Sequence, residues 1–297
     1  MERRTRDANA KLQLLLSVFI FGSIGIFVRF IPLPSSLIAL IRGVIGTLFL
    51  LFVLLIRKQR LSLAAIKANL LLLTLSGAFI GFNWILLFEA YRYTSVATAT
   101  LCYYLAPVFV TVASPFVLRE RLTKAKLICV LAALIGMVFV SGVLSGARES
   151  LSLRGVAFGI GAALLYASVI LMNKHLNDIA SLDMTIVQLS AAALVLLPYT
   201  LLTEDVAAVR FTPMTTVLLV IVGIVHTGLA YVLYLGSIQK LRAQTVAIFS
   251  YVDPIVAILL SALLLNERLD FYGAVGAVLI LGATLVSDLL DGRAERA

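Results

Sequence analysis

Ten apolar runs follow one another along the chain, each close to the length of about 20 residues that an α-helix needs to cross a bilayer. The runs are too long for strands and do not alternate, which excludes a lipid-facing barrel. Since 62% of the residues are hydrophobic and only 13% are charged, a water-soluble core of this size could not bury the apolar surface. We therefore predict an all-α integral membrane protein with ten transmembrane helices, near residues 12–30, 36–56, 67–90, 95–118, 125–144, 154–174, 184–202, 213–239, 243–265 and 271–290.

A block of twenty residues occurs twice in the chain. The first copy spans residues 103–122 and the second 250–269, at an offset of 147, and seven of the twenty positions are identical. In an apolar chain, such duplication is typical of transporters built from two repeats around a shared pocket. We predict two five-helix repeats, residues 1–148 and 149–297. Because five is an odd number, the second repeat enters the membrane from the opposite side, so the two repeats are inverted.

The lysine and arginine residues indicate which side of the membrane each connection occupies. Placing both termini in the cytoplasm puts 17 of these residues in cytoplasmic segments and six in external segments, with Arg42 inside a helix. Cytoplasmic loops of membrane proteins carry such an excess. We therefore predict a multi-pass protein of the cytoplasmic (inner) membrane, with cytoplasmic N- and C-termini. The net charge of +9 follows from this topology and does not indicate a nucleic-acid partner.

The sequence predicts no metal site, no cofactor and no enzymatic activity. Cys102 and Cys129 lie within apolar runs, and His175 and His226 are far apart, so none of them has metal-site spacing. The chain lacks a Gly-x-x-x-x-Gly-Lys-Ser/Thr loop, so ATP hydrolysis is not an intrinsic activity. A membrane-embedded enzyme would need acid, base or metal-binding residues that converge at one depth, and the sparse ionisable residues form no such cluster.

Several motifs resemble one family of transporters. The spacing from Pro107 to Glu120, repeated from Pro254 to Glu267, resembles the fourth and ninth helices of the EamA-type transporters, the ten-helix members of the drug/metabolite transporter superfamily. Phe21-Gly22-Ser23 is similar to the aromatic-Gly-Ser element of their first helix, and Arg42 resembles their second-helix arginine. The resemblance covers almost the whole chain. It implies an exporter of amino acids or other metabolites, and the YddG-like amino-acid exporters are the nearest group.

Polar and aromatic side chains recur at steps of three and four along the predicted helices. In the fourth helix, Thr100 and Tyr104 share one face, and Tyr251 is the counterpart of Tyr104 in the ninth. Such a stripe gains nothing from lipid and should face protein or a cavity, so helix packing is one interpretation. Aromatic rings also offer apolar contact and a face that attracts cations. On the second interpretation, the substrate-binding surface is formed by Arg42, Phe79, Asn83, Trp84, Thr100, Tyr104, His226, Tyr231 and Tyr251.

Ionisable residues within membrane spans are functional candidates by default. Asp253 lies about midway along the ninth predicted helix and has no acidic counterpart, because Ala106 occupies the matching position. Asp253, His226 and Glu89 are therefore candidates for coupling transport to a proton. Arg42 either meets an anionic group of the substrate or serves in a structural ion pair, and the sequence leaves both interpretations open.

These features together predict a secondary transporter. It would export small amphipathic metabolites, amino acids foremost and aromatic ones among them, by alternating access from a site near the bilayer midplane. Its partners would be the small-molecule substrate, the lipid bilayer and a proton, and it would act as a monomer or weak dimer. A broad exporter of quaternary cations is the alternative within transport. A membrane enzyme and an assembly subunit are the alternatives outside it, and neither predicts a duplicated polar stripe.

Overall fold

Helices account for all the regular secondary structure in the part of the chain that the computed structural model describes, residues 2–119, 123–140, 153–238, 240–241, 243–267 and 269–294. The α-helices and two short helices of other types (η1, a 3-10 helix, and η2, a π-helix) are α1 (Glu2–Arg29), α2 (Ser35–Ile56), α3 (Leu63–Tyr93), α4 (Val96–Tyr103), α5 (Ala106–Val117), α6 (Lys124–Val140), α7 (Leu153–Asn173), α8 (Ser181–Thr203), η1 (Val206–Ala208), α9 (Pro213–Gly223), η2 (Ile224–Leu229), α10 (Ala230–Ile238), α11 (Ala243–Ser250), α12 (Val252–Leu264) and α13 (Phe271–Ala294).

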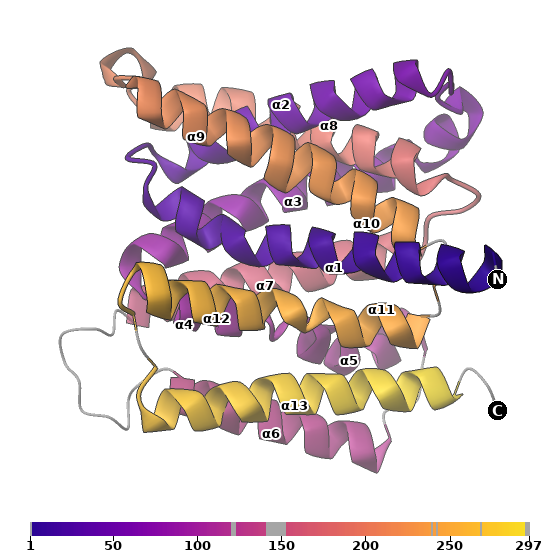
Figure 1. Ribbon diagram of the computed structural model, residues 1–297, viewed down its shortest axis with the longest axis vertical. Helices are drawn as coiled ribbons and strands as arrows, with labels where there is room; N and C mark the ends of the chain where they lie inside the picture. The colour runs from indigo at the N-terminus through magenta and orange to yellow at the C-terminus, as the bar shows by residue number, and fades with distance from the viewer. Residues whose placement is uncertain are drawn as a thin grey trace.

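The helices lie side by side in one elongated bundle (Figure 1). At one edge α6 packs against α13, and towards the other edge α2 packs against α8 and α9. Between them, α1 and α7 each pack on helices from the other half of the chain: α1 packs on α10 and α12, and α7 on α3, α4 and α5. The central part of the bundle is therefore built from both halves of the sequence.

The prediction of an all-α membrane protein is confirmed within the described residues. Seven helical stretches are long and apolar enough to cross a membrane. The predicted runs at 125–144, 243–265 and 271–290 correspond to α6, to the broken pair α11 and α12, and to α13, of which only the stretch Phe271–Ser287 counts as an apolar helix. The first helix is longer than the predicted run at 12–30, because α1 begins at Glu2.

The two copies of the repeated block share their backbone conformation. The helix breaks at Tyr104, with φ −70° and ψ 4°, and again at Tyr251, with φ −72° and ψ −8°. Each copy also ends on a left-handed residue, Arg119 at φ 57° and Asn266 at φ 56°. Residues 147 apart in sequence thus have the same local structure, and each run predicted as one helix is two helices.

Prolines explain why the breaks occur where they do. Pro107 and Pro254 lie in the first turns of α5 and α12. A proline has no N–H for the carbonyl four residues earlier, and its ring clashes with that carbonyl in a continuous helix. The first turn of a new helix accommodates proline without this cost. The repeated proline therefore places a break near the middle of each of the two runs.

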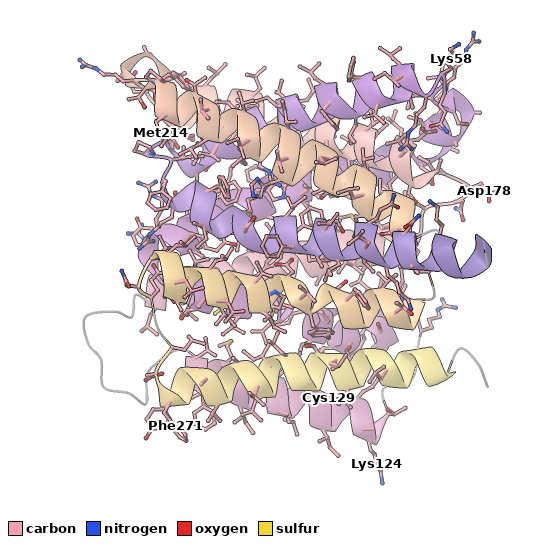
Figure 2. The ribbon with its side chains drawn as sticks, viewed as in Figure 1. Lys58, Lys124, Cys129, Asp178, Met214 and Phe271 are labelled. Atoms are coloured by element: carbon pink, nitrogen blue, oxygen red, sulfur yellow. The ribbon has the colours of Figure 1, made fainter. Side chains whose placement is uncertain are left out.

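Both described ends of the chain lie at the same end of the bundle, where α1 begins and α13 finishes (Figure 1). Lys58 and Lys124 also lie there, whereas Met214 and Phe271 lie at the other end (Figure 2). We call these the basic end and the opposite end.

Candidate functional site

The breaks in the two repeated helices meet in the middle of the bundle. The Tyr104 hydroxyl donates a hydrogen bond of 3.1 Å to the carbonyl of Ser250, which is the carbonyl that Pro254 leaves without its helical donor. The rings of Tyr104 and Tyr251 approach to 6.4 Å between centroids. The sequence-predicted pair of tyrosines is thus brought together by the helix breaks.

An aromatic cluster surrounds this meeting point, with side chains from α1, α4, α7 and α10. The ring of Tyr103 stacks on Tyr166 at 5.3 Å and meets Tyr104 edge-on at 6.5 Å. Phe21 meets Tyr231 at 5.6 Å and a second tyrosine of α10 at 6.1 Å. We call these residues the tyrosine cluster: Phe21, Tyr103, Tyr104, Tyr166, Tyr231 and Tyr234.

The rings of the tyrosine cluster are partly accessible. Tyr166 is 39% exposed. Leu164, which is also exposed, lies two residues away and so points to a different side of α7. Tyr103, Tyr231 and their neighbours in the cluster are likewise only partly buried. The exposed surface of Tyr166 therefore lies on a different side of α7 from that of Leu164.

Asp253 contributes a carboxyl group to the same region. It lies in the first turn of α12, where the helix dipole stabilises a negative charge. Its side chain is half-buried and lies beside the Tyr104 hydroxyl. Asp253 forms no ion pair with any described residue.

Arg42 lies on α2, is 5% exposed and has a fixed position. Its Nε donates a hydrogen bond of 3.1 Å to the Thr227 hydroxyl, and its guanidinium carbon lies 3.9 Å from the Trp84 ring centroid. Thr227 donates in turn to the carbonyl of Val222, five residues earlier. This i−5 bond is possible because η2 is a π-helix, a feature that often occurs at functional sites.

A glycine allows the close approach of α2 to η2 that this arrangement requires. A Cβ atom at Gly46 would lie 2.5 Å from the Thr227 Cγ2 atom, closer than any side chain tolerates. The absent side chain lets Thr227 reach the Arg42 side chain one turn away.

At the opposite end of the bundle, Glu267 connects several helices. Its carboxylate accepts hydrogen bonds from the Val96 N–H at 2.8 Å and from the Ser261 hydroxyl at 2.6 Å. It also pairs with Arg29 at 3.4 Å, and Arg29 donates to the carbonyl of Tyr91. These contacts, which we call the Glu267 latch, join the ends of α1, α3 and α12 to the start of α4.

The matching serine of the first repeat is bonded differently. Ser114 donates its hydroxyl hydrogen to the carbonyl of Val110 at 2.9 Å, whereas Ser261 donates to Glu267. A hydroxyl has one hydrogen to donate, so Ser114 does not donate to a carboxylate. Glu120, the counterpart of Glu267, lies outside the described residues. The two copies thus share a backbone but differ in this contact.

Some of the other predicted site residues lie within helix packing. His226 is 2% exposed, its Nε2 lies 3.0 Å from the Ser23 hydroxyl, and its ring centroid lies 4.6 Å from that of Phe27. Asn83 donates to the carbonyl of Ala162 on α7 at 2.6 Å. Both residues are therefore held by neighbouring helices.

Three predicted site residues remain, Glu89, Phe79 and Thr100, and none of them belongs to the tyrosine cluster. Glu89 pairs with Arg92 one turn along α3, at 3.1 Å, near the opposite end. Phe79 packs against the hydrophobic core, and Thr100 is buried on α4. The structure places these three residues but assigns them no ligand contact.

Sequence reasoning missed Tyr103 and Tyr166. Both are tyrosines near the middle of apolar runs, whereas membrane tyrosines concentrate at the two interfaces. That unusual depth was the available signal. Their mutual stacking could not be read from the sequence, because it depends on how α4 packs against α7.

The described residues include no group of three or more His, Cys, Asp or Glu side chains that could hold a metal ion. The arrangement offers instead a cationic group, a carboxyl group and aromatic hydroxyls around accessible space. Such groups can bind and release a small polar or amphipathic molecule.

Comparison with known proteins agrees with this arrangement. The model of the EamA-like transporter family matches residues 9–142 and 153–287. "Uncharacterized transporter YxxF" of Bacillus subtilis (strain 168) is 31% identical over 293 residues, which are 98% of this chain and 93% of that protein. "Uncharacterized transporter YoaV" of the same organism is 26% identical over 256 residues, 84% of this chain and 85% of that protein. A protein crystal structure with a TM-score of 0.66 and 20% identity, covering 97% of this chain and 99% of that one, has the same fold. This chain belongs to the EamA-like transporter family.

Proposed function

We propose that this membrane transporter is a secondary transporter that exports small amphipathic metabolites, amino acids foremost, by alternating access. In this proposal, residues 1–148 and 149–297 form inverted five-helix repeats with ten spans in total. The matched packing of helices supports it. The contact of α1 with α10 has its counterpart in the contact of α7 with α3, and the equivalent helices α2 and α8, like α6 and α13, pack on each other.

The observation that carries the proposal is a difference between the two ends of the broken helices. Towards the opposite end, α4 packs against α12, and the Glu267 latch holds this contact. Towards the basic end, α5 and α11 do not pack together to a comparable extent in the described chain. The pair α4 and α12 is equivalent to the pair α11 and α5, but the two pairs pack unequally. Alternating access requires such a difference, because exchanging the two packing arrangements moves the opening from one side of the membrane to the other.

The basic end is the cytoplasmic side in this proposal, so the conformation described here is open to the cytoplasm. A pocket of about 440 Å³ lies at that end, and another of about 560 Å³ lies at the opposite end beside Arg29 and Tyr91. The first pocket is lined by the connection from α2 to α3, by the start of α8 and by Val232, Leu235 and Gly236 of α10. Because α10 also carries Tyr231, this pocket offers a route towards the tyrosine cluster. Entry from the cytoplasm fits an exporter in the cytoplasmic membrane with both termini inside.

We further propose roles for the candidate residues. Asp253 and the tyrosine cluster contact the substrate. The buried Trp84, His226 and Asn83 position neighbouring groups. Asp253 carries the coupling proton, because its carboxyl group borders accessible space at mid-membrane. A single chain supplies all these groups, so a monomer or weak dimer suffices.

Counterflow in proteoliposomes tests the transport function. Vesicles containing the purified protein are loaded with a mixed pool of unlabelled amino acids, and uptake of the same labelled amino acids is followed. We expect transient accumulation of at least one amino acid above the level of protein-free vesicles. No accumulation of any amino acid, together with counterflow of quaternary ammonium compounds, would identify the broad cation exporter instead. Absence of counterflow for both classes contradicts secondary transport of either kind.

Substitution of Trp84 tests whether its ring serves transport by holding Arg42. We expect Trp84→Leu to transport roughly two- to thirtyfold more slowly than Trp84→Phe, because a cation on an aromatic face gains about 0.5–2 kcal/mol. Leucine and phenylalanine both leave part of the tryptophan volume empty, so their comparison isolates the aromatic face. The measurement is initial counterflow rate at equal amounts of inserted protein. Equal rates for the two variants would remove the proposed role of the ring.

A further inference from the structure

Building on the proposed transport function, we infer that the central site recognises a zwitterion by its two ends. A carboxylate of the substrate binds the terminal nitrogens of Arg42, an ammonium group binds Asp253, and the rest of the molecule lies against the tyrosine cluster. Arg42 and Asp253 are then the residues that determine which charge class is carried.

The first observation is that the Arg42 guanidinium is held in place but most of its N–H groups have no acceptor. A guanidinium has five N–H donors, and Arg42 uses only that of Nε, on Thr227. Its terminal nitrogens have no acceptor among the described residues, and no carboxylate lies within ion-pair distance. Neither nitrogen is one of the side-chain atoms of the described residues that are both fully enclosed and without a hydrogen-bond partner. They therefore reach accessible space, although the side chain as a whole is only 5% exposed.

The fixed position of Arg42 leaves its fork free for one kind of partner. Thr227 and the Trp84 ring hold the guanidinium from its Nε side and one face. The remaining edge presents two parallel N–H groups, the geometry that binds a carboxylate through two hydrogen bonds. A positive charge at this depth without a counter-ion is costly, and a bound carboxylate removes that cost.

The second observation is the carboxyl group of Asp253, which comes from the other half of the chain. It is half-buried and forms no ion pair in the described residues. Arg42 and Asp253 do not neutralise each other. Both nevertheless lie beside the same stretch of α1. Thr227, which binds Arg42, lies one turn before Tyr231, whose ring meets that of Phe21 at 5.6 Å, and the next residue, Gly22, packs directly on the turn that carries Asp253.

Charge balance favours a zwitterion over either singly charged class. A quaternary cation satisfies Asp253 but leaves Arg42 unpaired and faces its repulsion. A simple carboxylate satisfies Arg42 and leaves Asp253 unpaired. Specificity arises as much from such unmatched charges as from attraction. An amino acid matches both groups, and the aromatic rings provide apolar contact for its side chain.

The experiment compares molecules that differ only in charge. Purified protein in detergent is titrated with phenylalanine, phenethylamine and phenylpropionate, and with leucine, isoamylamine and isocaproate, and binding is followed by the shift in melting temperature. We expect at least one amino acid to bind about tenfold more tightly than both of its singly charged analogues. Arg42→Gln should abolish the preference over the amine and retain that over the carboxylate. Asp253→Asn should do the reverse.

Two further variants serve as controls. Arg42→Lys keeps the charge without the two-pronged fork, and we expect weaker binding with the preference for amino acids retained. Arg210→Gln removes an arginine that lies exposed in the connection before α9, and we expect wild-type binding.

Three outcomes would overturn the inference: equal affinity for amine and amino acid, the same change of preference in both site variants, or no binding of any of the six compounds at millimolar concentration. Counterflow decides transport separately: charge-selective binding without counterflow refutes transport alone, and counterflow that prefers amines or simple carboxylates refutes the zwitterion site alone.

Discussion

Replacing Glu267 with alanine is expected to shift the protein from the conformation described here towards one that is open at the opposite end. The variant loses the acceptor for the Val96 N–H and the Ser261 hydroxyl, together with the ion pair to Arg29. Hydrogen bonds to a charged group contribute about 1.5–3 kcal/mol, and a half-exposed ion pair adds about 0–1 kcal/mol. A loss of roughly 2–3 kcal/mol from one conformation changes the ratio of the two by roughly 30- to 150-fold.

A single-cysteine reporter measures this shift. Ala97 is fully buried on α4 and, seven residues before Tyr104, shares its helical face. In a background with Cys102 and Cys129 replaced by alanine, Ala97→Cys is labelled with a membrane-impermeant maleimide from the side of the opposite end. We expect Glu267→Ala to raise the labelling rate at least roughly 30-fold. Glu267→Gln keeps an acceptor oxygen and loses only the charge, so its rate should rise less.

Two outcomes of the labelling experiment bear on the Glu267 latch. A rate for Glu267→Ala within about twofold of the parent would mean that the latch contributes less than about 0.5 kcal/mol to the closed end and does not govern access. A large rise in Glu267→Gln equal to that in Glu267→Ala would mean that the charge, and so the pair with Arg29, carries the effect. In either case the rate is read at matched protein levels.

The sequence was sufficient for the class of fold, because membrane spans are set by local composition. The apolar runs from residue 36 to 56 and from 154 to 174 match α2 and α7 to within one residue at each end. The fourth and ninth runs were each predicted as a single helix, although Pro107 and Pro254 mark the breaks. Apolar side chains continue without interruption through both breaks, so hydropathy alone cannot detect them.

The site was less accessible to sequence reasoning, because contacts between helices depend on exact rotation. The π-helix η2 inserts one extra residue per turn and so changes which side chains face α2. Thr227 thereby meets Arg42, and His226 turns towards Ser23 on α1. A regular α-helix, with 3.6 residues per turn, would present a different set of side chains to α2. The functional roles of these residues stay predictions.

The Phe21-Gly22-Ser23 element shows how a short motif can serve three contacts that sequence cannot separate. Phe21 joins the tyrosine cluster, Ser23 contacts His226, and Gly22 lies directly against the backbone of α12. Consecutive helical residues point in directions about 100° apart, so each of the three addresses a different neighbour. The motif marked a close contact, and the structure identifies the partner as the turn that carries Asp253.

Replacing Gly22 with alanine should therefore disrupt the junction between α1 and α12. The added Cβ would lie 2.4 Å from the Asp253 carbonyl oxygen and 2.9 Å from the Val256 Cβ, so the two helices must move apart. Overpacking of this kind costs about 1–3 kcal/mol, more than the gain of about 1 kcal/mol that alanine normally brings within a helix. We expect a lower free energy of unfolding and, because Asp253 is displaced, counterflow at least roughly tenfold slower.

Gly282 supplies the matched control, since a Cβ there would meet no atom within 4 Å. Gly282→Ala should leave counterflow unchanged and raise the free energy of unfolding by up to about 1 kcal/mol. Both variants are compared with the parent by denaturant titration in detergent and by counterflow in proteoliposomes. If Gly22→Ala matches Gly282→Ala in stability and rate, α1 does not press on the Asp253 turn. If instead Gly22→Ala keeps its stability and loses only transport, the close contact between α1 and α12 is needed for the conformational change and not for the fold.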